Sequence, residues 1–203
     1  MNQIKERYNR ISGIYDFLEW PVEFMLLKWR KELLKEAAGK TLEVGIGTGK
    51  NLPWYPAEVL LTGIDFSEQM INKARRNARK RGDRPELKVM DAEDMQFEDN
   101  SFDTVVTSCV FCSVPNPVSG LQEIRRVCKN GGKILMLEHV RSNHRMAGKL
   151  MDILNPIPCR IIGENVNRRT YDNLIEAGFD KNDIEAKNLW FDIVKKFRII
   201  NHK

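Results

Sequence analysis

The sequence predicts an α/β protein in which a mainly parallel β-sheet carries helices on both faces. Between residues 40 and 140, short apolar runs alternate with amphipathic stretches in the order strand, helix, strand. The chain has 203 residues, which is enough for one well-buried core but short for two domains. Its composition, 42% hydrophobic and 30% charged, is ordinary for a globular protein. We therefore expect a single domain.

That domain is expected to consist of an N-terminal helical cap, residues 1–39, and a core, residues 40–203. The cap shows a helical pattern over residues 16–38 that is broken at Pro21 and ended by Gly39. Five strands are expected early in the core, at residues 41–47, 59–65, 87–91, 102–110 and 131–140. Helices are expected at residues 67–82, 117–129, 145–158 and 167–179, and two late strands at residues 183–190 and 191–200. Ser67 is the expected N-cap of its helix, and Gly131 and Gly132 the turn before the fifth strand.

Composition and charge indicate in which part of the cell the protein is expected. The N-terminus is polar and charged without an apolar segment after a basic start, and no apolar run approaches the ~20 residues of a membrane span. We therefore expect a cytoplasmic protein. The net charge of +5 is compatible with binding to anionic lipid surfaces or to nucleic acid without choosing between them, and such an excess is more often only a solvated surface.

The cysteines are expected to be reduced, buried thiols, and no metal site is predicted. Cys109 and Cys112 have the C-x-x-C spacing, but no second close pair completes a zinc site. The pair also lies at the end of an apolar run, not at the start of a helix.

The most informative loop follows the first strand and contains alternating glycines. It runs from Glu43 through Gly45, Gly47 and Thr48 to Gly49. A dinucleotide fingerprint would need its third glycine at position 50, where this chain has lysine. The alternation therefore counts against a pyrophosphate cradle and favours a loop that passes beneath an amino-acid moiety.

Two aspartates follow the next two strands. Asp65 ends the second strand, where a carboxylate can accept both hydroxyls of a ribose. Asp91 ends the third strand in an acidic run with Ala92 and Glu93, where an acid beside a backbone amide can read the edge of adenine. The alternative for this run is an exposed acidic loop. In an open parallel sheet these strand ends share one ligand crevice, so the three features predict one site for an adenosyl-amino-acid ligand.

With these stretches the chain resembles the class I S-adenosylmethionine-dependent methyltransferases over roughly residues 8–140. The matching segments are LEVGIGTGKNLPWYP, LTGIDFSEQM, MDAEDMQFEDNSFDTVV and EIRRVCKNGGKILMLEH. The resemblance implies a Rossmann-like sheet of seven strands with the last one antiparallel. It also implies a cofactor site in which the three glycines line the methionine and ribose and Asp65 holds the ribose. Phe66 and Met70 would flank the adenine, and Asp91 and Ala92 would read its edge. Ser108, Cys109 and Val110 would form a wall after the fourth strand, and the remaining residues expected at the site, in the same loops, are Glu43, Thr48 and Glu93.

Within this class the chain resembles three groups. The spacing of Tyr8, Tyr15 and Asp16 matches bacterial phosphatidylethanolamine N-methyltransferases and ubiquinone/menaquinone C-methyltransferases. Residues 137–140 and 165–168 are more similar to membrane-associated thiol methyltransferases. We expect a small or amphipathic acceptor, with a phospholipid amine head group first and a quinone ring carbon or a thiol as alternatives. A non-catalytic S-adenosylmethionine sensor is the alternative from a different functional class.

Methyl transfer from a sulfonium needs alignment of the acceptor, and it needs a general base only when the acceptor must lose a proton. His139 ends the fifth strand and faces the acceptor space of this fold, as a base, an orienting group or a core histidine. Tyr8 and Tyr15 are expected either to place aromatic faces near the sulfonium or to pack a helix.

Two partner classes remain. The N-terminal segment, which carries Trp20, Phe24, Leu27, Lys28, Trp29, Arg30 and Lys31, is expected either to lie at the inner face of a membrane or to pack as core. Nucleic acid is not expected, because the run from Ser108 to Phe111 lacks the two prolines found in base-amine methyltransferases.

Overall fold

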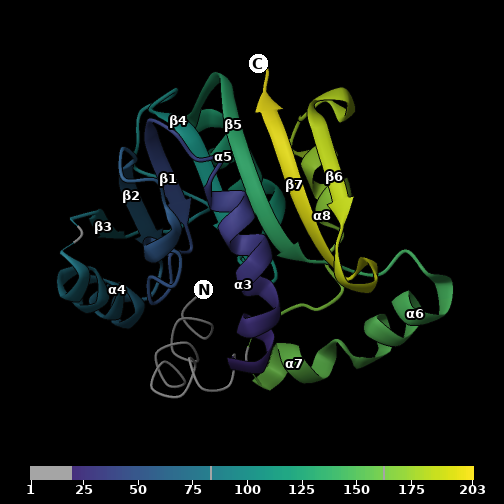
Figure 1. The fold of residues 1–203 in the computed structure, drawn as a ribbon. Helices are drawn as coiled ribbons and strands as arrows, with labels where there is room; N and C mark the ends of the chain where they lie inside the picture. The colour runs from purple at the N-terminus through teal and green to yellow at the C-terminus, as the bar shows by residue number, and fades with distance from the viewer. Residues whose placement is uncertain (1–19, 83, 162) are drawn as a thin grey trace.

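The computed structural model describes residues 20–82, 84–161 and 163–203, so Tyr8 and Tyr15 lie outside the described residues. In those residues the chain forms one seven-stranded sheet with the order β3-β2-β1-β4-β5-β7-β6 (Figure 1). The strands are β1 (Lys40–Val44), β2 (Leu60–Asp65), β3 (Glu86–Val89), β4 (Phe102–Ser108), β5 (Cys128–His139), β6 (Ile184–Asn188) and β7 (Val194–Asn201). The first five strands pair in parallel, and β7 pairs antiparallel with both β5 and β6. The predicted Rossmann-like sheet with an antiparallel last strand is confirmed.

The strand order reverses next to β1. β1 pairs with β2 on one side and with β4 on the other, so the carboxyl ends of β1 and β4 open into the same crevice. This crevice is where an open α/β sheet binds its ligand, and the loops that follow β1, β2, β3 and β4 line its rim.

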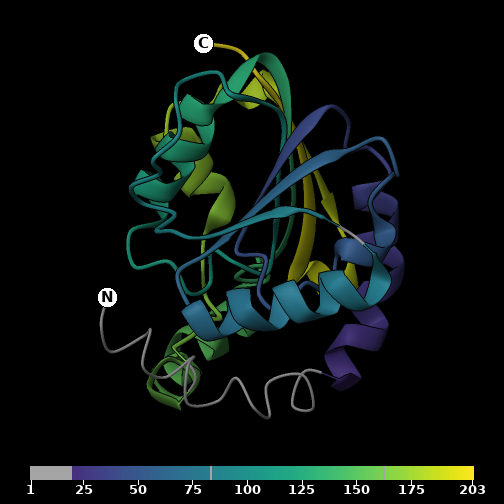
Figure 2. The ribbon, with the colours of Figure 1, turned by 90° about the vertical axis from the view of Figure 1, so that its left-hand side faces the viewer.

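Helices cover both faces of the sheet, as Figure 2 shows from the side. They are α3 (Trp20–Leu34), α4 (Glu68–Arg81), α5 (Pro117–Val127), α6 (Arg145–Leu154), α7 (Pro156–Ile161) and α8 (Thr170–Glu176). The side chains of Val105 and Val106 point to opposite faces because they are neighbours on one strand. Val105 joins the core cluster beneath α5 and α8, whereas Val106 joins the cluster beneath α3.

The helix after β2 has the predicted start and stop. The Ser67 hydroxyl accepts the backbone N–H of Met70 at 3.3 Å, which satisfies one of the free donors of the first turn. Gly82 ends the helix in the left-handed conformation, with φ 77°, where glycine has no steric penalty. α4 is therefore bounded by local chemistry that the sequence displays.

The fifth strand starts earlier than expected. β5 begins at Cys128, and its register against β4 shifts between the pairs Phe102–Cys128 and Thr104–Lys133. Gly131 lies inside this irregularity with φ 74°. The glycines thus form a bulge within the strand, and the expected turn before it is wrong.

The described part of the N-terminal cap packs on the sheet. The described part of α3 begins at Trp20 and the residues before it lie outside the described residues, so the expected break at Pro21 stays a prediction. Leu26, Leu33 and Leu34 are buried against β4 and β5. The apolar side of α3, as far as its side chains are described, is core, and membrane contact through this segment stays a prediction.

After β5 the chain first passes the end of the sheet at which the parallel strands have their carboxyl termini. α6 and α7 extend there away from the sheet, and β6 and β7 form a hairpin at its edge (Figure 1). Within the described ranges, every helix is too short or too polar to cross a bilayer.

Candidate cofactor and acceptor site

The glycine loop after β1 lies directly beneath the loop after β4. Gly45, Gly47 and Gly49 all have positive φ, at 70°, 56° and 83°. A Cβ at Gly45 would lie 2.5 Å from Cγ2 of Val110, so no other residue fits there. A Cβ at Gly47 would meet nothing within 4 Å. Gly45 therefore joins two strand ends closely, and Gly47 borders open space, as a loop that approaches a ligand requires.

Asp65 faces this loop from the end of β2. Its Oδ2 accepts the N–H of Gly47 at 3.0 Å, and its Oδ1 accepts the N–H of Ser67 at 2.9 Å. Burial raises the pKa of this carboxyl to about 6, and the two backbone N–H groups counter part of the rise. Each carboxylate oxygen accepts one backbone N–H and retains a second lone pair for a ribose hydroxyl.

The acidic run after β3 is joined to Asp65 through the backbone. The N–H of Met90 donates to the Asp65 carbonyl at 3.0 Å. Oδ1 of Asp91 accepts the N–H of Glu93 at 3.0 Å, which closes a tight turn. The Glu93 carboxylate accepts the N–H of Asn116 at 2.9 Å, just before α5. Glu93 thus anchors the start of α5. Asp91 and Ala92, which come before it in the run, are the residues closer to Asp65.

The wall after β4 is held by Glu138, a residue for which the sequence analysis assigned no role. Oε2 of Glu138 accepts the N–H groups of Val110 and Phe111 at 3.1 and 3.2 Å, and its Oε1 accepts the Thr107 hydroxyl at 2.7 Å. The side chain is fully buried, and burial raises the pKa of its carboxyl to about 7. Cys109 in this loop has φ 56°, a conformation that non-glycine residues rarely adopt. One signal in the sequence points to Glu138: it is the single acid in an otherwise apolar run, and buried acids are kept only where they are hydrogen-bonded.

Glu43 is a second buried carboxylate that holds a loop in place, here beneath the glycine loop. Its carboxylate accepts the side-chain N–H of Asn51 at 2.6 Å and the Tyr55 hydroxyl at 3.0 Å. Burial raises the pKa of Glu43 to about 7, against those two hydrogen bonds and the charge of Arg30. Glu43 therefore fixes the return of the loop into the short helix Leu52–Trp54.

The other residues of the predicted cofactor site differ in how open they are. Met70 and Thr48 are buried, at 2% and 4% exposure, and Phe66 is half-buried. The Thr48 carbonyl accepts the Asn77 side chain at 2.9 Å, which joins the glycine loop to α4. Of these three, Phe66 is the one with a partly open surface.

His139 is the candidate catalytic residue that the structure describes. It is half-buried at the carboxyl end of β5, directly after Glu138, and burial lowers the pKa of its imidazole. The other two histidines lie elsewhere: His144 is exposed before α6, and His202 pairs with Asp183 at 2.7 Å near the C-terminus.

Residues 165–168 connect the wall after β4 to α6. The N–H of Asn165 donates to the Cys112 carbonyl at 2.8 Å, and the N–H of Val166 donates to the Asn155 side chain at 2.8 Å. Arg168 donates to the Val114 carbonyl at 2.6 Å. This segment thus holds the loop after β4 against the C-terminal end of α6.

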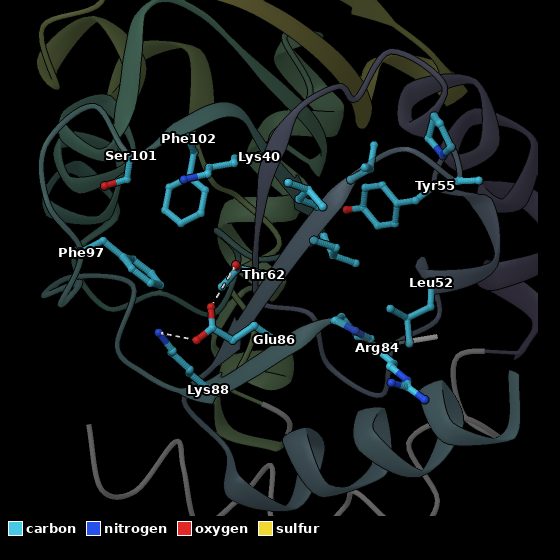
Figure 3. A pocket seen from close by; sticks show the side chains of 16 residues that line it. Lys40, Leu52, Tyr55, Thr62, Arg84, Glu86, Lys88, Phe97, Ser101 and Phe102 are labelled. Atoms are coloured by element: carbon cyan, nitrogen blue, oxygen red, sulfur yellow. Dashed lines mark hydrogen bonds and ion pairs between the residues drawn. The ribbon is translucent and has the colours of Figure 1, made fainter. Parts of the chain in front are cut away.

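A separate cavity of about 690 Å³ lies at the opposite ends of the strands (Figure 3). Lys40, Leu60 and Glu86, the first residues of β1, β2 and β3, are among its lining residues. Glu86 is paired there with Lys88 at 2.9 Å. Because this cavity is at the amino ends, it includes none of the predicted cofactor residues.

The described residues form neither a disulfide nor a cluster of metal ligands, and the burial expected of the cysteines holds for Cys112 and Cys128 but not for the half-buried Cys109 and Cys159. No disulfide joins Cys109, Cys112, Cys128 and Cys159. Across residues 20–82, 84–161 and 163–203, no three histidine, cysteine, aspartate or glutamate side chains cluster as metal ligands.

Comparison with known proteins agrees with this geometry. Residues 42–136 match the model of a methyltransferase domain family. The chain is 37% identical over 141 residues to phosphatidylethanolamine N-methyltransferase of Cereibacter sphaeroides, covering 68% of this chain and 69% of the relative. It is 32% identical over 147 residues to a ubiquinone/menaquinone biosynthesis C-methyltransferase of Geotalea daltonii, covering 67% of this chain and 63% of that protein, just under two thirds.

Among solved structures, an S-adenosylmethionine-dependent methyltransferase from Thermotoga maritima superimposes with a TM-score of 0.71 at 20% identity. The match covers 98% of this chain and 99% of that one, and at this identity it shows the fold. The family match and the close relative together establish the enzyme class and its cofactor, S-adenosylmethionine. The chain belongs to the class I S-adenosylmethionine-dependent methyltransferases.

Proposed function

We propose that this enzyme methylates the amine of a phospholipid head group of the phosphatidylethanolamine type, at the inner face of a membrane. The observation that carries the proposal is the position of His139, a half-buried imidazole next to the residue that holds the wall after β4. The 37% identity to a phosphatidylethanolamine N-methyltransferase supports the same acceptor.

The residues at the strand ends divide the binding of the cofactor among them. Gly47 leaves room for the methionine and ribose, Asp65 accepts from the ribose hydroxyls, and Asp91 with Ala92 reads the adenine. S-adenosylmethionine supplies an electrophilic methyl group on a sulfonium with a neutral leaving group. The rigid contact between Gly45 and Val110 fixes the floor and wall between which cofactor and acceptor align.

His139 gives the site a group that fits an amine acceptor. A phospholipid ethanolamine is an ammonium ion at neutral pH, and it must lose a proton before its nitrogen has a lone pair for attack. Burial lowers the pKa of His139, which favours the neutral imidazole with a free lone pair at which this proton would be accepted. General-base assistance of this kind contributes about 10²–10⁴-fold in rate.

The proposal is tested by incubating the enzyme with methyl-labelled cofactor and vesicles that contain phosphatidylethanolamine. We expect label in the N-methylated phospholipid. For His139→Ala we expect unchanged affinity for S-adenosylmethionine and a turnover at least roughly a hundredfold lower. His202→Ala is the matched control, because this histidine lies at the far end of β7.

Three outcomes contradict the proposal. Label that appears only in a quinone or a small thiol moves the acceptor to one of those classes. Tight cofactor binding without transfer to any lipid, quinone, thiol or RNA fraction favours a sensor. An unaltered rate in His139→Ala reduces that histidine to a packing residue.

A further inference from the structure

Helices α6 and α7 expose a continuous apolar stripe. Five large apolar side chains on α6 and α7 are between 45% and 77% exposed. They are Met146, Leu150, Ile153, Leu154 and Ile157. Their spacing of four, three, one and three residues places them on one side of a helix. Asn155, between α6 and α7, has helical backbone angles (φ −50°, ψ −37°), so the stripe continues from one helix into the next.

The opposite side of α6 is fixed to the protein. Gly148 is buried, and a Cβ there would lie 2.6 Å from the carbonyl oxygen of Ser142. Arg141 binds the Asp152 carboxylate at 2.8 Å, with a second hydrogen bond from its Nε at 3.0 Å. Because these contacts hold the rotation of α6, the apolar stripe points away from the protein.

An exposed aromatic pair lies beside this helix. Phe191 is 79% exposed, and its ring lies 5.8 Å from that of Trp190. Phe191 and Asp192 both have positive φ, at 43° and 61°, which costs free energy in non-glycine residues. The N–H of Asn143, just before α6, donates to Oδ2 of Asp192 at 2.7 Å, so this loop and α6 form one surface. In Figure 1 the loop between β6 and β7 lies beside the segment that leads from β5 into α6.

Basic residues border one edge of the stripe. Arg145, Lys149 and Arg160 are all exposed. At 100° per residue they fall on the same side of the stripe, between it and the face that contacts the protein. The one acid of α6, Asp152, is paired with Arg141. The surface thus combines an apolar stripe, two aromatics and a cationic edge.

We propose that this surface, formed by α6, α7 and residues 190–191, docks the enzyme on an anionic phospholipid bilayer. An apolar helix face with basic and aromatic neighbours is the composition of helices that lie in the membrane interface. The cationic edge is complementary to anionic head groups. α6 follows His139 by only a few residues, so docking brings the rim of the crevice to the lipid surface. This inference concerns lipid binding and does not depend on which acceptor is methylated.

The test is sedimentation with vesicles of phosphatidylcholine and phosphatidylglycerol in equal parts, which contain no primary amine acceptor. We expect the wild-type protein to co-sediment, and Leu150→Glu/Ile153→Glu to bind at least tenfold more weakly, on the order expected for two lost apolar side chains. At low salt, Arg145→Gln/Lys149→Gln is expected to bind these vesicles more weakly than the wild-type protein, by about fivefold for each positive charge removed. On vesicles of phosphatidylcholine alone, the charge variant and the wild-type protein are expected to bind equally.

Leu60→Glu is the matched control, because Leu60 is 65% exposed at the amino end of β2, far from α6. Equal vesicle binding by the wild-type protein and Leu150→Glu/Ile153→Glu, with both folded by circular dichroism, overturns the proposal. A wild-type dimer that this double variant makes monomeric also overturns it, since the occupant is then a second copy. Vesicle binding without methylation of phosphatidylethanolamine retains the docking surface and rejects the proposed acceptor.

Discussion

At the scale of the residue, the site depends on carboxylates that are buried and nevertheless hydrogen-bonded. Asp65, Glu43 and Glu138 are each under 10% exposed, and burial raises the pKa of all three. A buried carboxyl is costly unless donors surround it, and each of these three accepts at least two hydrogen bonds. Through these hydrogen bonds the three carboxylates hold the loops of the crevice in place.

The first prediction concerns Asp65. We expect Asp65→Ala to weaken S-adenosylmethionine binding more than tenfold, because a hydrogen bond to a charged group is worth about 1.5–3 kcal/mol. Isothermal titration calorimetry measures the binding affinity. If Asp65→Ala disturbs the glycine loop, Asp65→Asn serves as a second variant, because asparagine has nearly the same size and shape as aspartate. Asp180→Ala, in an exposed turn near the C-terminal hairpin, is the control. Unchanged affinity in a folded Asp65→Ala protein would refute the ribose role.

At the scale of the element, the loop after β4 is shaped by the strand beside it. Cys109 donates its N–H to the Leu137 carbonyl at 2.8 Å, and the next two N–H groups donate to Glu138. Three successive amides of the loop are therefore satisfied by β5. The wall is stable because its polar backbone groups have partners inside the protein.

The second prediction concerns this wall, for which Glu138 is a positioning residue. In Glu138→Ala both carboxylate oxygens are removed, so the N–H groups of Val110 and Phe111 lose their acceptor. We expect faster hydrogen exchange at those two amides and roughly tenfold weaker cofactor binding, because an unsatisfied buried group costs about 1–3 kcal/mol. Glu185→Ala, on the exposed face of β6, is the control. If exchange at residues 110 and 111 is unchanged, the carboxylate does not hold the loop.

At the scale of the whole molecule, the buried acids make folding stability depend on pH. Glu43 and Glu138 have pKa values of about 7 in the folded protein against a usual value of 4.5. Between those two values the folded chain retains protons that the unfolded chain has released. Their contribution to the free energy of unfolding is therefore fully present below about 4.5 and is lost as the pH rises through about 7.

The third prediction follows from that sign. We expect Glu43→Gln to show a smaller loss of stability across this pH window than the wild-type protein, by up to roughly 3 kcal/mol. Denaturant unfolding of both proteins at the two ends of the window measures the difference. Glu58→Gln, on the surface loop before β2, is expected to follow the wild-type curve. Parallel curves for Glu43→Gln and the wild-type protein would show that Glu43 does not release a proton in this range.

The sequence by itself determined the order of strands and helices along the chain and the class of cofactor, because both depend on local patterns. Apolar runs of strand length, the cap at Ser67 and the glycines after β1 are short-range signals, and parallel strands bring their carboxyl ends together in any fold of this class. For that reason Gly45, Asp65 and Asp91 could be predicted as cofactor residues before their neighbours were known.

Only the tertiary structure decided which residues on neighbouring strands contact each other and which helix faces remain exposed. Glu138 is 28 residues from Val110 in the chain, and nothing local to either residue shows that they are bonded. The amphipathic pattern of α6 is the same whether its apolar side is buried or exposed. Its orientation is settled by Gly148 against Ser142 and by Arg141 with Asp152, and these contacts turn the stripe outward. Periodicity records which residues share a face, whereas packing selects the face that is buried.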